Sequence, residues 1–201
     1  MPFIPKSFTK IHPLYSDDIQ EFLELNNITP NKIYLRDSDK DKIPSKKSYY
    51  VINLDEESGS GTHWTSLFVD SKKAYYYDSF GLPCPNEILN WVKNKNNKKL
   101  FYIDNQHQPN DSELCGYFAC YYLYSMHKGT PVDEYLNIFD DEGKETNDKK
   151  LLRLMHIGTD DASSFIVDKN DKRATGAGID VVKKLNEFLP NVEFHLRDVK
   201  F

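Results

Sequence analysis

The stretch "NDSELCGYFACYYL", residues 110–123, places a cysteine at the start of an apolar, aromatic-rich run, with a glycine directly behind it. Gly129 follows as a stop signal, so the pattern predicts a mostly buried helix from about Cys115 to His127. A cysteine at this place can be a small core residue. It can also be a reactive thiol, because a helix N-terminus stabilises the thiolate form, and Gly116 leaves the adjoining backbone open to a substrate carbonyl. The choice depends on whether the chain also supplies a base, a group that orients it and an oxyanion donor.

A base and an orienting acid are predicted in the middle of the chain. Three aromatic and β-branched runs predict strands over 49–54, 63–69 and 74–80, and "DSKK" predicts a hairpin turn between the last two. His63 begins one of these strands, followed by Trp64, and Asp78 lies near the end of the next. Paired strands would let the Asp78 carboxylate hold one nitrogen of His63 while the other nitrogen faces a thiol.

An oxyanion donor is available in the polar loop before the helix. Gln108 precedes Cys115 by seven residues, and its side-chain amide could point N–H groups at a developing oxyanion. Gln106 is the nearby alternative. With either glutamine, the chain contains every part that thiol-dependent acyl transfer requires.

The remaining pattern is a mixture of helices and loops. Helices are predicted over 16–27 with Ser16 as the cap, and over 86–96, 132–139 and 148–157, with a further strand over 100–104. The lysine-rich stretch 31–48 is predicted to be an exposed connection. Strands cluster in the middle with helices on both flanks, which predicts an α+β fold with a central mixed or antiparallel sheet.

Length and composition limit the classes of protein. A chain of 201 residues fits a single domain, 1–201, with a motif-bearing core at about 50–127 and a peripheral C-terminal segment at 172–201. A net charge of −5 argues against a protein built around DNA. The N-terminus "MPFIPKSFTKIHP" lacks the apolar core of a signal peptide, so none is expected. No apolar run reaches about 18 residues, so no membrane span is expected either.

The three cysteines favour free thiols in a reducing compartment. Cys115, Cys120 and His127 lack the spacing of a zinc site, so no metal is expected. Cys84 and Cys120 match no functional position, and Cys120 is predicted to be a core residue.

The motifs "GTHW", "YYYDSFG" and "QPNDSELCGYFACYYL" resemble, in order and spacing, the adenovirus protease (adenain) family and the ubiquitin-like-protein proteases of clan CE. The resemblance covers about residues 50–127. It implies an adenain-like fold with His63 as general base, Asp78 as orienting acid, Gln108 as oxyanion donor and Cys115 as nucleophile. Trp64 and Gly116 would contribute to substrate binding. Adenain has Glu where this chain has Asp78.

By resemblance, the expected function is a virus-type processing protease that cleaves capsid or core precursors at glycine-containing sites. A monomer in the virion, host cytoplasm or virus factory is implied. No cofactor is expected apart from an activating peptide, and adenain's use of DNA is not transferred to this acidic chain. "ATGAG", residues 174–178, could itself be a cleavage site, with a cut between Ala177 and Gly178.

Three alternatives remain open. The first is an isopeptidase for ubiquitin-like or SUMO-like modifiers, which would use the same active site with a surface for a folded partner. The second is a virion or scaffold protein that has kept the fold and lost activity. The third is acyl transfer to a hydroxyl, as in the acetyltransferases of the superfamily.

Overall fold

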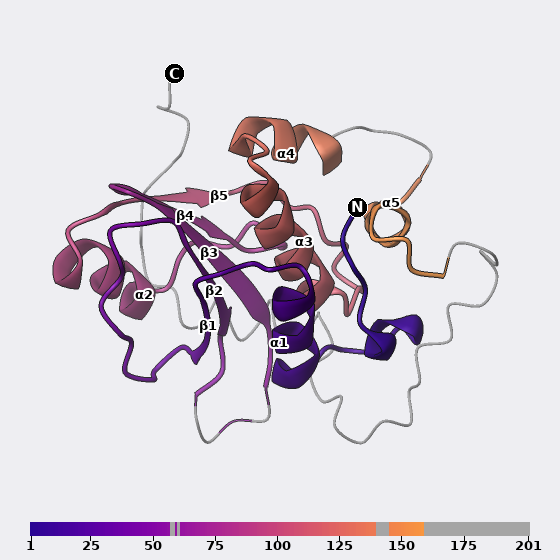
Figure 1. Cartoon of the computed structure of the whole chain (residues 1–201), viewed down its shortest axis with the longest axis horizontal. Coiled ribbons are helices and arrows are strands. Elements are labelled where there is room, and N and C mark those ends of the chain that lie inside the picture. Colours follow the sequence, from indigo (N-terminus) through magenta and orange to yellow (C-terminus); the bar gives the residue numbers. More distant parts are fainter. Residues whose placement is uncertain (57–58, 60, 140–144, 159–201) are drawn as a thin grey trace.

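A five-stranded mixed sheet is the centre of the molecule (Figure 1), in a computed structural model that describes residues 1–56, 59, 61–139 and 145–158. The strand order is β1-β2-β3-β4-β5. The two outer pairs, β1 with β2 and β4 with β5, are parallel, and the inner pairs are antiparallel. The strands are β1 Asn31–Leu35, β2 Ser48–Asn53, β3 Trp64–Asp70, β4 Lys73–Tyr77 and β5 Lys99–Ile103.

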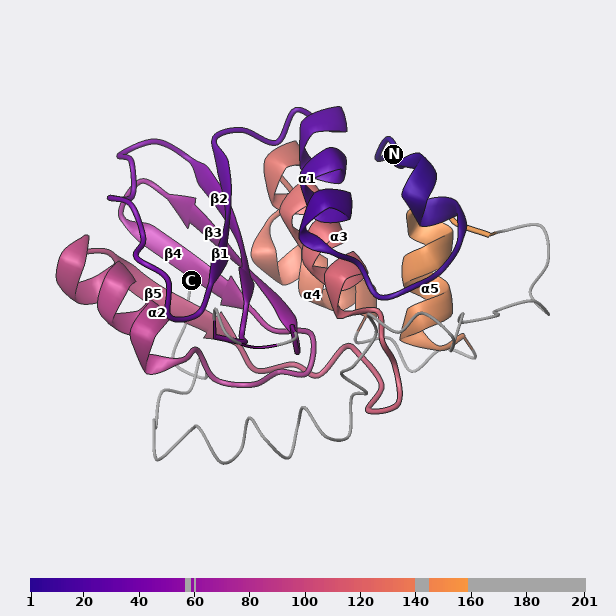
Figure 2. The ribbon, with the colours of Figure 1, turned by 90° about the horizontal axis from the view of Figure 1, so that it is seen from below.

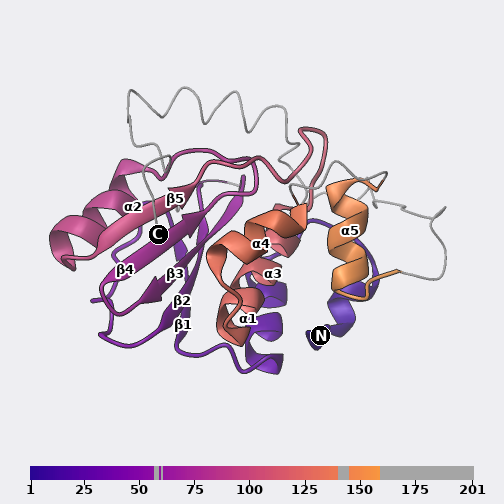
Figure 3. The same ribbon diagram turned by 90° about the horizontal axis from the view of Figure 1, so that it is seen from above.

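Helices cover both faces of this sheet (Figure 2). On one side lie α1 Ser16–Leu25, α3 Cys115–Lys128, α4 Val132–Phe139 and α5 Asn147–Leu154. On the other side lies α2 Asn86–Asn90, which continues into a π-helical turn over Trp91–Lys95. A short 3₁₀ turn, Lys6–Thr9, precedes α1, and α5 stands outside α3 and near the N-terminus of the chain (Figure 3).

Two hydrophobic cores follow from this arrangement. Alternate residues of a strand point to opposite faces, so Tyr49 and Val51 pack with the α3 side, whereas Tyr50 and Ile52 pack with the α2 side. Every residue of β2 is therefore buried. The larger core surrounds α3, whose residues from Gly116 to Met126 are all buried. This explains why the sequence of α3 is apolar on all sides instead of amphipathic.

The α+β class and the sheet flanked by helices are confirmed. The helix predicted from Cys115 extends to Lys128, and Gly129 ends it in a left-handed conformation with φ of 86°. The hairpin over "DSKK" joins β3 to β4, as predicted. The strand predicted over 100–104 is β5, displaced by one residue.

Two local expectations were wrong. Residues 31–48 include β1, which pairs in parallel with β2, so this stretch is not only an exposed connection. β1 lies at the edge of the sheet and is only partly buried, which weakens the hydrophobic pattern that would mark it as a strand. Ser16 is the first helical residue of α1 and not its cap, because Tyr15 holds the cap position and its N–H donates to the Asp18 carboxylate at 3.0 Å.

The expectations for the C-terminal segment concern residues that the structure does not describe. The segment 172–201, including the Ala177–Gly178 bond, lies outside the described residues. Among the residues that are described, no helix combines the length and the apolar character needed to cross a membrane.

Candidate active site

Cys115 is the first residue of α3, and its side chain is only partly buried. The next residues of the helix are covered on all sides by the core, so α3 is held firmly behind the thiol. Backbone N–H groups at a helix start have no partner within the helix and favour a nearby negative charge. Cys115 therefore lies at the positively polarised end of α3.

His63 and Asp78 are brought together by the β3–β4 hairpin. His63 immediately precedes β3 and Asp78 immediately follows β4, so the antiparallel pairing places the two residues at the same end of the hairpin. The His63 Nε2 atom lies 2.9 Å from Asp78 Oδ1, and both side chains are almost fully inaccessible to solvent. The same Oδ1 accepts the Phe80 N–H at 2.8 Å, which holds the carboxylate in place.

The His63 ring has strong electrostatic partners. Burial disfavours its charged form, but the charge and hydrogen bond of Asp78, together with the interaction with Cys115, outweigh burial and raise the pKa of His63 to about 10. Because Nε2 faces Asp78, the nitrogen available to Cys115 is Nδ1. The three residues thus form a connected acid–imidazole–thiol set at the start of β3, the end of β4 and the start of α3.

Gln108 lies in the loop between β5 and α3 and is buried. Its Oε1 accepts a hydrogen bond of 2.6 Å from the Ser79 hydroxyl, and its Nε2 donates to the Ser112 carbonyl at 2.8 Å. A longer contact of 3.3 Å joins Nε2 to the Ser112 hydroxyl. The amide is therefore held at both ends.

Gln106 has a different environment. Its side chain is exposed, and its Nε2 donates to the Gln108 carbonyl at 3.0 Å and to Asn110 Oδ1 at 2.7 Å. Both hydrogen bonds join Gln106 to other residues of the same loop. Of the two candidate donors, Gln108 is the one that is buried and tied to the turn before α3.

Trp64 and Gly116 both meet the N-terminal segment at Leu14. The indole Nε1 of Trp64 donates to the Leu14 carbonyl at 2.7 Å. A Cβ atom on Gly116 would lie 3.0 Å from the Cβ of Leu14, which is closer than ordinary packing allows. In this structure the missing side chain of Gly116 admits Leu14, and Gly116 itself is buried.

The other two cysteines have no comparable setting. Cys84 and Cys120 are buried, and burial raises the pKa of each thiol well above its ordinary value. A buried neutral thiol is a weak nucleophile. Only Cys115, among the three, combines exposure with a histidine neighbour.

Sequence reasoning missed Ser79 and Ser112 as partners of Gln108. Ser79 directly follows Asp78, and Ser112 lies three residues before Cys115, so both stood inside the quoted motifs. Serine is common in turns, and nothing in the local pattern showed that these two hydroxyl-bearing residues would meet one glutamine. The described residues hold no group of histidine, cysteine and carboxylate side chains that could bind a metal ion.

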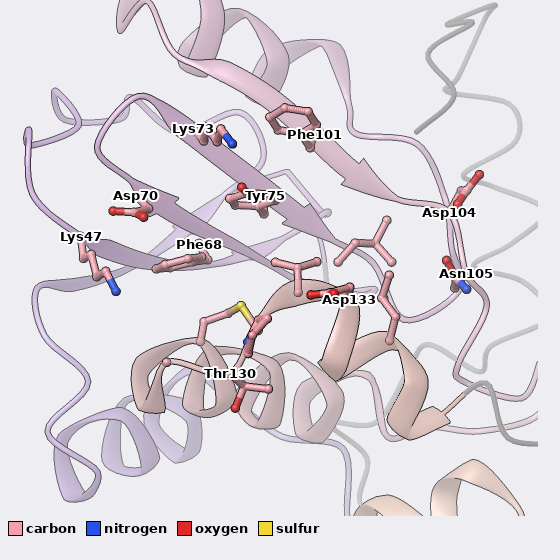
Figure 4. Close-up of a pocket in the computed structure, with 16 residues that line it drawn as sticks. Lys47, Phe68, Asp70, Lys73, Tyr75, Phe101, Asp104, Asn105, Thr130 and Asp133 are labelled. Carbon is pink, nitrogen blue, oxygen red and sulfur yellow. The ribbon is translucent and has the colours of Figure 1, made fainter. Parts of the chain in front are cut away.

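A separate concavity lies over β3, β4 and β5, beside the end of α3 and the first turns of α4 (Figure 4). It has a volume of about 620 Å³ and is lined by Phe68, Tyr75 and Phe101, which stack across adjacent strands. Lys47 and Lys73 lie at its edge together with acidic side chains. None of the candidate catalytic residues lines it.

Comparison with known proteins identifies distant relatives among viral proteases. The chain is 31% identical over 97 residues to a protein of Acanthamoeba polyphaga mimivirus named "Putative thiol protease", a match that covers 43% of this chain and 32% of the relative. It is 27% identical over 86 residues to the SUMO-1 cysteine protease of African swine fever virus, covering 36% of this chain and 31% of that protein. No family model matches the chain.

The fold agrees with a solved protease structure. The crystal structure of the African swine fever virus protease superposes with a TM-score of 0.54 at 16% identity, over 77% of this chain and 70% of that one. The chain is thus a distant homologue of viral cysteine proteases with a matching α+β fold, as its motifs predicted. The sequence matches extend over about a third of the length of the curated relatives.

Proposed function

We propose that the chain is a cysteine endopeptidase in which Cys115 is the nucleophile, His63 the general base and Asp78 the group that orients the base. The observation that carries the proposal is the buried 2.9 Å contact between His63 and Asp78, with Cys115 as the other partner of the ring. Homology to thiol proteases supports the same chemistry. Gln108 is proposed as the oxyanion donor.

The first step forms a thioester. His63 Nδ1 takes the proton of Cys115, and the thiolate sulfur attacks the carbonyl carbon of the scissile peptide bond. Asp78 accepts the hydrogen bond from Nε2 and stabilises the imidazolium that results. When the tetrahedral intermediate collapses, His63 gives its proton to the leaving amine, and the C–N bond breaks.

The oxyanion requires N–H donors beside the sulfur. The backbone N–H of Cys115 at the start of α3 is one candidate, and the Gln108 amide is the other. Of the two Gln108 contacts with Ser112, the 2.8 Å bond to the carbonyl is the firm one. The 3.3 Å contact with the hydroxyl is long, so the N–H that makes it is only weakly bonded and can donate to an oxyanion without a rotation of the amide.

The second step releases the acyl group. A water molecule that loses its proton to His63 attacks the thioester carbon, and the C–S bond breaks as the carboxylic acid leaves. Cys115 and His63 then return to their starting protonation states. These steps use Cys115, His63 and Asp78, the proposed oxyanion donors and one water molecule.

The proposed substrates are viral capsid or core precursors cut at glycine-containing sites. The support is that the matched relatives are viral proteins. Isopeptidase activity on a SUMO-like modifier is the second candidate, because one relative is named a SUMO-1 cysteine protease. A panel of modifiers with C-terminal vinyl sulfones separates the two, since a processing endopeptidase should leave all of them unlabelled.

The decisive experiment measures alkylation of Cys115 by iodoacetamide as a function of pH, with the labelled sites identified by mass spectrometry. We expect rapid labelling that persists well below pH 8, because a thiolate paired with an imidazolium does not require high pH. His63→Ala should abolish this rapid phase. Cleavage of glycine-containing peptides, absent in Cys115→Ala, then identifies the reaction.

Labelling of Cys115 no faster than that of Cys84, or unchanged by His63→Ala, would contradict the proposal. The inactive-scaffold alternative would then be favoured. A monomeric state, independence from DNA and residence in the virion or virus factory stay predictions.

A further inference from the structure

Ser79 makes three hydrogen bonds with the loop that carries Gln108. Its carbonyl accepts the backbone N–H groups of His107 at 2.9 Å and Gln108 at 2.8 Å. Its hydroxyl donates to Gln108 Oε1 at 2.6 Å. Both side chains are 1% exposed, so water cannot replace these bonds. The residue after the orienting acid is thus bound to the proposed oxyanion donor.

The two ends of the Gln108 amide have different partners. The Ser112 carbonyl can only accept a hydrogen bond, so the Nε2 end of the amide must face it, at 2.8 Å. Oε1 then faces Ser79, whose hydroxyl can donate. The amide can satisfy both partners in only one of its two orientations.

The bonds with Ser112 also place the Nε2 end near the start of α3. Ser112 lies three residues before Cys115, and its hydroxyl accepts the N–H of Leu114, the residue that caps the helix. The N–H groups of Gln108 are therefore directed at the turn that leads into the nucleophile. The carbonyl end is directed away from that turn and toward Ser79.

We propose that Ser79 is a positioning residue that fixes the Gln108 amide with its N–H groups toward the oxyanion site. The inference rests on the proposed function, in which Gln108 donates to the oxyanion. Without the Ser79 hydroxyl, Oε1 would be buried with no donor, and the amide would lose one of its two anchors. A donor that must be reoriented in each catalytic cycle stabilises the transition state less.

The test compares two reactions of the same sulfur. A peptide aldehyde forms a C–S bond with Cys115, and its former carbonyl oxygen occupies the oxyanion site. Iodoacetamide is attacked at a saturated carbon and releases iodide, so it forms no oxyanion. Ser79→Ala should weaken aldehyde binding about tenfold, the loss expected for one buried hydrogen bond. The rate of iodoacetamide labelling should stay within about twofold of wild type, because the His63–Cys115 pair is untouched.

Ser125→Ala is the matched control. Ser125 is also buried, and its hydroxyl donates to the Tyr121 carbonyl at 2.9 Å within α3, with no bond to the Gln108 loop. This variant should leave aldehyde binding unchanged. Ser79→Thr retains a hydroxyl donor and should bind the aldehyde more tightly than Ser79→Ala. Thermal unfolding of each variant verifies that it is folded.

A double-mutant cycle distinguishes positioning from a general structural effect. If Ser79 acts through Gln108, Ser79→Ala should change aldehyde binding less than about twofold in the Gln108→Ala background. An equal loss in both backgrounds, or no loss in Ser79→Ala alone, overturns the inference while the proposed function stands. Absence of rapid Cys115 labelling in wild type overturns the proposed function, and the inference with it.

Discussion

At the scale of single residues, the reactivity of a side chain is decided by its neighbours. His63 is the clearest case, since its ring has a buried carboxylate on one side and a thiol on the other. Gln106 and Gln108 lie in the same loop but in different environments. The Gln106 side chain is exposed, whereas Gln108 is buried.

The raised pKa of His63 predicts a specific dependence of stability on pH. The folded protein holds the ring proton up to about pH 10, whereas a free histidine loses it near pH 6.5. This contribution to stability is complete below about pH 6.5 and is lost as the pH rises toward 10. Urea unfolding in a Cys115→Ala background removes the contribution of Cys115 and leaves that of Asp78, so stability should decline by about 1–3 kcal/mol above pH 6.5 and the decline should end below pH 10.

The control adds His63→Gln to the same background. Its free energy of unfolding should change less over this pH range, because the titrating ring is gone. Parallel pH profiles for the two proteins would contradict the raised pKa.

Gln108→Ala and Gln106→Ala form a matched pair. Loss of an oxyanion donor reduces turnover by about 10²–10³-fold, so Gln108→Ala should show this loss of kcat with rapid Cys115 alkylation retained. Gln106→Ala should keep kcat within a few-fold, since its side chain is exposed and its hydrogen bonds are to other residues of the same loop. The measurement is steady-state cleavage of a glycine-containing peptide. The reverse pattern would reassign the oxyanion donor to Gln106.

At the scale of elements, the site depends on helices and segments outside the motif-bearing core. The segment before α1 reaches the start of α3 through Leu14, and α5 reaches the Gln108 loop through its first turn. Asn147 at the start of α5 donates to the His107 carbonyl at 2.9 Å. The Leu14 contact supports the start of α3, which bears Cys115. The Asn147 bond supports the loop that bears Gln108.

Gly116→Ala tests the approach of Leu14 to α3. The added Cβ would lie 3.0 Å from Leu14 Cβ and 3.3 Å from its Cδ1 and Cγ, so we expect a destabilisation of about 1–3 kcal/mol from overpacking. Leu14→Gly removes all three contacting atoms. The penalty for Gly116→Ala should shrink in that background, as measured by urea unfolding. An unchanged penalty would mean that Leu14 is not the obstacle.

Asp148→Asn tests the first turn of α5. Burial raises the pKa of Asp148 to about 6, although a hydrogen bond from Ser112 opposes the shift and the nearby Asp111 charge adds to it. A raised carboxyl pKa contributes stability below about pH 4 that is lost as the pH rises through 6. At pH 8 the charge on this partly buried carboxylate is a cost, so Asp148→Asn should stabilise the protein by about 1 kcal/mol.

Asp133→Asn is the control for this substitution. Asp133 is the second residue of α4, as Asp148 is of α5, but its side chain is exposed. Asp133→Asn should not raise the free energy of unfolding at pH 8. Urea unfolding of both variants and of wild type at pH 5 and pH 8 measures the difference. A loss of stability in Asp148→Asn at pH 8 would show that the bond to Ser112 outweighs burial.

At the scale of the whole molecule, the fold separates one thiol from the other two. Cys84 lies in the core on the α2 side of the sheet and Cys120 in the core around α3, whereas Cys115 is partly exposed. Iodoacetamide should therefore label only Cys115 in the native protein and all three cysteines in urea. Mass spectrometry of tryptic peptides reads out each site. Native labelling of Cys84 or Cys120 at the rate of Cys115 would contradict this packing.

Two expectations concern the chain as a whole and its C-terminal segment. Organisation as a single domain and a cut at Ala177–Gly178 stay predictions. Mass spectrometry of the purified protein and of its Cys115→Ala variant tests the cut, since identical C-termini in the two would exclude self-processing there.

Local sequence patterns were enough to predict the α+β class, most of the helices and strands, and the approach of His63 to Asp78. These features depend on local periodicity and on a hairpin whose strands are adjacent in the chain, so short-range patterns contain them. Three features depend instead on long-range packing: β1 joins the sheet, Leu14 fills the space at Gly116, and Ser79 and Ser112 hold Gln108. Those contacts join distant parts of the chain. A local pattern records that a residue is buried or polar, but it does not record which distant residue is its partner.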